Sequence, residues 1–186
     1  MITDAHCWIA NNNKEKPPMS PQHRSIEQRL EQLEDREKIK ELKYRYAFHL
    51  DNGYDPDSIA ALFSEDGEWI IKGVGGDVRG QGAIREHCKN LSKGILWSQH
   101  DIFAPRVEIS DQGDRAVAHF NLVCLLTMRS DVADAKGEAF LLAGNYTDHL
   151  VKVDGEWLFQ SMTGTIEQSS PWTKGWVEAP FKKESW

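Results

Sequence analysis

Cysteine, basic charge and long apolar runs are all scarce in this chain of 186 residues. The three cysteines, Cys7, Cys88 and Cys124, show neither the spacing of metal ligands nor a pattern of pairs. Such a set disfavours a disulfide scaffold and predicts a reducing compartment, with the cytoplasm as the default location. No apolar run approaches the roughly 18 residues of a membrane span, and residues 1–20 lack the basic start and apolar centre of a signal peptide. A membrane partner is therefore not expected.

The charge balance argues against nucleic acid as a partner. The formal net charge is -7, and the basic residues form no stripe along the sequence. A nucleic-acid surface normally needs a basic patch or a basic helix face. The length fits one domain, and no segment repeats at a fixed period.

The chain is organised around the stretch KIKELKYRYAFHLD, residues 38–51. Its residues Ile39, Leu42 and Tyr46 recur at spacings of three and four, which predicts one apolar helix face. The pair Asn52 and Gly53 follows at once and is a typical stop signal for a helix.

Asp51 breaks a local rule at the end of this helix. The helix dipole is negative there, so a carboxylate is unfavourable by about 0.3–1 kcal/mol. A residue that breaks a local rule without visible compensation is a candidate for function. The alternative is that Asp51 only helps to form the Asp-Asn-Gly turn.

Helices and antiparallel strands are segregated along the sequence, which indicates the α+β class. We expect a helix over 26–51 with a phase shift near Asp35, a short helix from Pro56, strands over 68–72 and 78–80, and a helix over 81–93. Four long strands follow over 95–110, 116–128, 138–153 and 157–167. Pro105 predicts an edge or a bulge in the first of them. The sheet is expected to curve around the long N-terminal helix and to leave a pocket at its open end.

Both ends of the chain differ from this core in composition. Residues 1–24 are rich in Asn, Lys, Pro and Ser, which predicts a flexible N-terminal arm. Residues 169–186 are polar apart from four aromatic residues, Trp172, Trp176, Phe181 and Trp186. Such aromatics need a surface to lie on, either the domain itself or a neighbouring subunit.

Several strings, taken with the order of elements, resemble those of a known family. They are EWIIKGVG at 68–75, GQGA at 80–83, GNYTD at 144–148 and DGEW at 154–157. These strings resemble the SnoaL-like branch of the nuclear transport factor 2-like superfamily, over about residues 26–168. The resemblance implies a cone-shaped α+β barrel, with residues 25–168 as its domain, and assembly into a dimer or trimer.

The same resemblance implies a catalytic pair, an Asp at the end of the first helix and a His on the first long strand. Asp51 and His100 stand at these positions, and Tyr46 stands where dehydratases of the family have a Tyr. An Arg on the last strand, used by lyases of the family, has no counterpart at 162–166.

These three residues predict proton chemistry without a metal or organic cofactor. A His has a suitable pKa for a general base, and a carboxylate on its other ring nitrogen stabilises the imidazolium that forms. Tyr46 then donates its proton to a leaving oxygen or holds a carbonyl. The set suits a dehydratase-like lyase that performs β-elimination on a small hydrophobic cyclic or polycyclic substrate. Isomerase or cyclase work in the same pocket, and a non-catalytic binding or assembly domain, are the alternatives.

Aromatic and histidine residues on the strands are candidates for the pocket wall. We expect substrate contacts from five of them: Trp69, Trp97, Phe120, Tyr146 and His119. The alternative for such residues is ordinary core packing. His49 and His87 are expected to be surface or packing residues.

Overall fold

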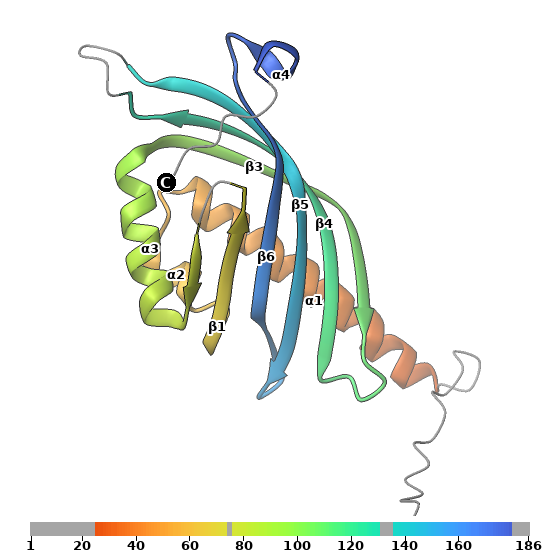
Figure 1. Cartoon of the computed structure of the whole chain (residues 1–186). Coiled ribbons are helices and arrows are strands. Elements are labelled where there is room, and N and C mark those ends of the chain that lie inside the picture. The colour runs from red at the N-terminus through yellow and green to blue at the C-terminus, as the bar shows by residue number, and fades with distance from the viewer. Residues whose placement is uncertain (1–24, 74–75, 131–135, 180–186) are drawn as a thin grey trace, which may run out of the picture.

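A six-stranded sheet curves around one long helix in the computed structural model of the chain (Figure 1). The structure describes residues 25–73, 76–130 and 136–179. The elements in chain order are α1 (Ile26–Asp51), α2 (Pro56–Ala60), β1 (Phe63–Lys72), β2 (Asp77–Arg79), α3 (Gln81–Gly94), β3 (Ile95–Ile109), β4 (Arg115–Met128), β5 (Glu138–Val153), β6 (Glu156–Pro171) and α4 (Gly175–Glu178). The predicted α+β class, with a curved sheet around an N-terminal helix, is confirmed.

The strands lie in the order β2-β1-β6-β5-β4-β3. Only the pairing of β1 with β6 is parallel, so the sheet is mostly antiparallel as predicted. Strand β3 is an edge strand, and its register with β4 shifts between Phe103 and Arg106. Pro105 predicted an edge strand or a bulge, and both are present in β3, since proline cannot donate a ladder hydrogen bond.

Helix α1 starts and ends where the sequence predicts. Ser25 caps it in a capping box with Gln28, in which each side chain accepts from the other's backbone N–H. The apolar residues of its first half are exposed, whereas one face of its second half is buried: Ile39, Leu42, Tyr46, Ala47 and Leu50. Asp35 is an exception in the charged first half, because it is 3% exposed and accepts from Lys152 and Trp157. The apolar phase shift near Asp35 thus coincides with a polar anchor between α1 and the β5–β6 hairpin.

The concave face of the sheet forms the core together with α1. Every second residue of β4 from Ala116 to Leu126 is buried, while the residues between them are more exposed. This alternation is the two-residue period of a strand with one buried face. Helices α2 and α3 lie beside β1 and cover the end of the sheet nearest β2 (Figure 1).

Two predicted boundaries are wrong. Strand β1 starts at Phe63 instead of 68, and β6 runs to Pro171 instead of 167. Trp172 and Trp176 follow β6 and lie beside Leu141 with much of their surface exposed. The N-terminal arm 1–24 and the residues from 180 onward fall outside the described residues, so the division of the chain into arm, domain and tail stays a prediction.

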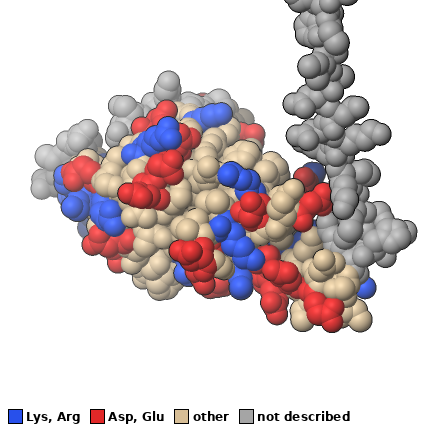
Figure 2. Space-filling view, turned by 90° about the horizontal axis from the view of Figure 1, so that it is seen from below, with Lys and Arg blue, Asp and Glu red and all other residues tan. Residues whose placement is uncertain are grey.

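The surface carries both signs of charge. Figure 2 shows acidic and basic side chains interspersed over one face of the molecule, without a continuous basic area. Within the described ranges, none of the helices is both long and apolar enough to cross a membrane.

Candidate active site

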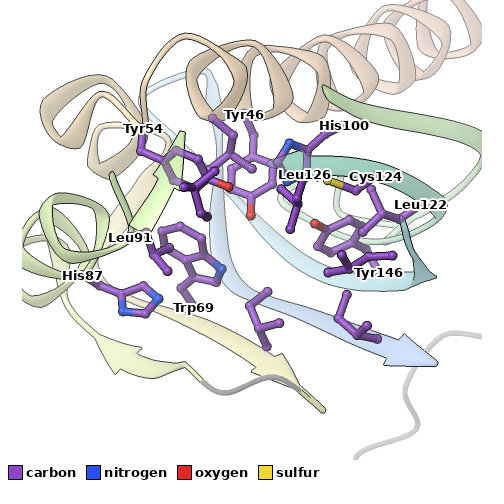
Figure 3. Close-up of a pocket in the computed structure, with 15 residues that line it drawn as sticks. Tyr46, Tyr54, Trp69, His87, Leu91, His100, Leu122, Cys124, Leu126 and Tyr146 are labelled. Atoms are coloured by element: carbon purple, nitrogen blue, oxygen red, sulfur yellow. The ribbon is translucent and has the colours of Figure 1, made fainter. Parts of the chain in front are cut away.

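A cavity lies between the second half of α1 and the concave face of the sheet (Figure 3). Its wall is mostly apolar and aromatic: Tyr46, Leu50, Tyr54, Trp69, Ile71, His87, Leu91, Ile95, His100, Leu122, Cys124, Leu126, Leu142, Tyr146 and Ile166. The volume that the centre of a water molecule can occupy inside it is about 70 Å³. The total empty space, which includes the open mouth of the cavity, is about 540 Å³. By the first measure one water needs roughly 10–15 Å³, so the interior has room for several water molecules.

Asp51 and His100 meet at the end of α1. Oδ1 of Asp51 lies 2.6 Å from Nδ1 of His100, and Oδ2 accepts from the backbone N–H of His100 at 2.9 Å. The hydroxyl of Ser98 donates to Oδ1 at 2.9 Å. These contacts compensate for the unfavourable position of a carboxylate at a helix C-terminus. Asp51 therefore joins α1 to β3 in addition to closing the turn.

The protonation of this pair follows from the state of Asp51. Partial burial alone would raise the pKa of Asp51, but the hydrogen bonds from His100 and Ser98 outweigh burial and lower it. The carboxylate is thus ionised at neutral pH and can only accept, so Nδ1 of His100 carries the shared proton. In the neutral imidazole this leaves Nε2 as an acceptor, and His100 is part of the cavity wall.

Two tyrosine hydroxyls lie near the middle of the cavity wall (Figure 3). Tyr46 and Tyr146 are 1% and 3% exposed, and their rings meet edge to face with centroids 6.1 Å apart. Burial raises the pKa of both phenols well above the ordinary value. Both side chains therefore hold their protons and act as hydrogen-bond donors.

Trp69 forms the wall opposite α1. It stacks on Phe63 with ring centroids 6.2 Å apart and meets the edge of Tyr46 at 5.8 Å. His87, expected to be a surface or packing residue, also lines the cavity and contacts Trp69 at 5.1 Å between centroids. Burial lowers the pKa of His87, which keeps the imidazole neutral.

Three residues expected at the pocket lie elsewhere. Trp97 is 50% exposed, because it alternates with the inward-facing Ser98 on β3. His119 is on the outward face of β4 and hydrogen-bonds Thr147 instead. Phe120 is buried on the concave side, but it packs near the ammonium of Lys43 and does not line the cavity. The predictions failed because residue type alone does not reveal which face of a strand a side chain occupies, or how far a buried side chain lies from the cavity.

Ser98 and Tyr54 are residues of the site that sequence reasoning missed. Ser98 is two residues before His100, so the period of a strand would have placed both on one face. Tyr54 follows the helix stop with a positive φ of 59° and packs against the ring of His100 at 6.4 Å between centroids. Nothing in the local sequence distinguishes Tyr54 from an ordinary turn residue.

A buried ion pair lies behind the two tyrosines. Nζ of Lys43 is 3.0 Å from Oδ2 of Asp148, and both side chains are fully buried. The same nitrogen is 3.3 Å from the centre of the Tyr146 ring. Burial lowers the pKa of Lys43 to about 8, against the opposing effect of Asp148. Sequence reasoning missed Lys43 as a buried residue, although it precedes Tyr46 by three, a helical spacing that would have placed both on one face.

In the part of the chain that the structure describes, no group of three or more His, Cys, Asp or Glu side chains could hold a metal ion. The residues with chemistry at the cavity are instead the His100–Asp51 pair and the neutral donors around it.

A curved, mostly antiparallel sheet closed over an N-terminal helix, with a cavity between them, is the nuclear transport factor 2-like fold. The family model of the SnoaL-like domain matches residues 31–163, and the chain belongs to that family. The predicted resemblance is thereby confirmed. Domains of this family process or bind small hydrophobic molecules, and they include lyases, isomerases and non-catalytic members.

Solved structures support the same fold. A type 2 hexachlorocyclohexane dehydrochlorinase (LinA) is similar at 22% identity with a TM-score of 0.67, over 77% of this chain and 92% of that one. A putative scytalone dehydratase from Novosphingobium aromaticivorans gives 21% identity and a TM-score of 0.66, over 77% and 91%. A protein of unknown function from Mycobacterium tuberculosis gives 26% and 0.62, over 74% and 75%. No curated protein matches the chain.

Proposed function

We propose that this protein is a cofactor-independent lyase that removes water from a small hydrophobic cyclic substrate by β-elimination. The observation that carries the proposal is the contact of His100 with Asp51, which leaves Nε2 of the imidazole as an acceptor at an apolar cavity. An imidazole oriented by a carboxylate is suited to abstract a proton beside an electron-withdrawing group.

The reaction begins when Nε2 of His100 takes a proton from a carbon of the substrate. The electron pair of the broken C–H bond forms the new C=C bond, and the C–O bond at the neighbouring carbon breaks. The imidazolium is stabilised by the ionised Asp51 and returns its proton to the leaving oxygen as water departs. Tyr46 holds its own proton because burial raises its pKa, so it assists by donating a hydrogen bond. Of its two predicted roles, the structure favours holding an oxygen over giving up the proton.

The charge of the wall favours water over halide as the leaving group. Among the described residues that line the cavity there is no Lys or Arg, and the position of the family's last-strand Arg is also uncharged in this sequence. Lys43 is separated from the cavity by the ring of Tyr146. A leaving group that departs as a neutral molecule requires no such cation.

Isomerisation is the second candidate, because the same observation favours it. When His100 removes a proton from one carbon and returns it to another, no leaving group departs, so no cation is needed to stabilise one. Elimination of water lowers the mass of the product by one water molecule, while isomerisation leaves the mass unchanged, so mass spectrometry separates the two reactions.

A non-catalytic binding domain is the third candidate, and the small interior of the cavity favours it. The volume of about 70 Å³ also favours a single small ring over a polycyclic substrate.

The test is turnover of cyclic β-hydroxy ketones with product masses recorded. General-base catalysis contributes about 10²–10⁴-fold, so we expect Asp51→Asn and His100→Gln to lose activity in that range. His119→Gln is the matched control, since it changes a histidine on the outward face of β4. Equal turnover in all four proteins would contradict the proposal.

A further inference from the structure

Trp69 carries a buried hydrogen-bond donor that has no partner. The side chain is 2% exposed, and its indole Nε1 has no hydrogen-bond acceptor among the described residues. An indole N–H can only donate, and a buried donor left unpaired is rare enough in native structures to need an explanation. The N–H of Trp157 offers a comparison within the same chain, because it donates to Asp35 at 3.0 Å.

The indole of Trp69 is also fixed in place. Phe63 stacks on one side of it, and Tyr46 and His87 meet it at right angles. Its backbone is paired on both sides, with Val78 and Met162 as register partners. The ring therefore cannot swing away to find an acceptor elsewhere in the protein.

The unpaired N–H of Trp69 points into the cavity, where the hydroxyl donors of two tyrosines also lie. Figure 3 shows the indole nitrogen of Trp69 turned toward the middle of the cavity, on the same side as the hydroxyls of Tyr46 and Tyr146. Each of these hydroxyls keeps its proton and can donate it in a hydrogen bond to a ligand. His100, with its accepting Nε2, is in another part of the wall.

These donors are neutral, which limits the class of ligand. A carboxylate or phosphate would bring a negative charge into an apolar cavity that lacks a cation in its described wall, and burying an unpaired charge is very unfavourable. A ketone or enone oxygen satisfies the donors without that penalty. The same oxygen also acidifies the neighbouring C–H bonds, whose protons His100 would take.

We infer that the indole N–H of Trp69, together with the hydroxyls of Tyr46 and Tyr146, forms a docking site for the carbonyl oxygen of a small uncharged cyclic ketone or enone. This inference deepens the proposed function and rests on it for the role of His100. In this inference, the N–H of Trp69 determines where the activating oxygen of the substrate binds, and it requires that oxygen to be a hydrogen-bond acceptor.

The test compares two probes of nearly equal shape, cyclohexanone and methylenecyclohexane, which differ in having =O or =CH2. The full chain is labelled with 15N at tryptophan, and the indole resonance of Trp69 is assigned by its loss in Trp69→Phe. We expect cyclohexanone to move this resonance downfield in a saturable way and methylenecyclohexane to move it much less. The resonance of Trp157, whose N–H is already bonded to Asp35, should stay in place with both probes.

Affinity supplies the second readout. A neutral hydrogen bond is worth about threefold to tenfold in affinity. Trp69→Phe should therefore weaken the binding of cyclohexanone by that factor and leave the binding of methylenecyclohexane unchanged. Equal shifts with the two probes, equal losses for both, or no saturable shift with either would overturn the inference.

The same titration on Asp51→Asn separates this inference from the proposed function. The donor site does not need the base, so the downfield shift should persist in that variant even where turnover is lost. Turnover by the wild type without a selective shift at Trp69 would overturn the inference alone. A selective shift in a protein without turnover supports the docking site and removes only the lyase proposal.

Discussion

Asp51 combines a locally unfavourable position with several compensating hydrogen bonds. A carboxylate at a helix C-terminus is disfavoured, yet three donors from Ser98 and His100 hold this one. The sequence showed the violation but not its compensation, because the donors lie 47 and 49 residues further along the chain.

The lowered pKa of Asp51 predicts a pH-dependent contribution to stability. A carboxyl whose pKa is lower in the folded than in the unfolded protein stabilises the fold above its unfolded pKa. That contribution is lost as the pH falls through the folded pKa, which lies below the ordinary value of 3.8. We therefore expect the stability of the wild type relative to Asp51→Asn to fall as the pH is lowered below 4. Urea unfolding at each pH measures this, and a difference that stays flat down to pH 2 would contradict it.

At the scale of elements, the pair of Lys43 and Asp148 joins α1 to β5 behind the cavity. Removing one partner of a buried ion pair leaves an uncompensated charge, which costs about 3–5 kcal/mol. We expect Lys43→Met to lose stability in that range and the double variant Lys43→Met with Asp148→Leu to recover most of it. Chemical denaturation of the two single variants and the double variant measures the coupling.

The control for this cycle is an exposed pair on the same helix. Lys40 and Glu37 are 2.7 Å apart at the surface, and exposed pairs contribute only about 0–1 kcal/mol. Lys40→Met should therefore change stability little. A loss equal to that of Lys43→Met would show that the buried pair has no special role.

Elements were predictable where periodicity is strong. The bounds of α1 follow from Ser25 at its start and the Asn52–Gly53 turn at its end, and Pro105 located the irregularity of β3. The start of β1 at Phe63 was missed because the polar run Ser64, Glu65 and Asp66 has no strand pattern, and tertiary pairing near β6 overrides it.

At the scale of the whole molecule, the cone and the meeting of α1 with β3 were predictable, while the interior was less so. The resemblance brought Asp51 and His100 together because it carries spatial information that spacing lacks. It did not show which aromatics face inward. A strand with a bulge changes parity, and a buried side chain such as Phe120 can still lie too deep to reach the cavity.

The outer face of the sheet leads to a prediction about assembly. Trp97 and Phe103 are about half exposed on the edge strand β3, and exposed aromatics of this size are typical of interfaces. We propose that the protein forms a dimer or trimer through this face. Sedimentation should then give two or three times the 21.2 kDa mass of the chain. Trp97→Ser should shift the equilibrium toward monomer, whereas Phe48→Ser, on exposed α1, should not; a wild type that stays monomeric would reject the proposal.

The central claim is that His100 removes a proton from carbon, and hydrogen exchange tests it without a known substrate. Cyclohexanone is incubated with the protein in D2O, and the uptake of deuterium beside the carbonyl is followed by NMR. We predict exchange above the buffer rate in the wild type, a loss of about 10²–10⁴-fold in His100→Gln, and no loss in the control His119→Gln. Exchange that is equal in the wild type and His100→Gln would contradict the claim.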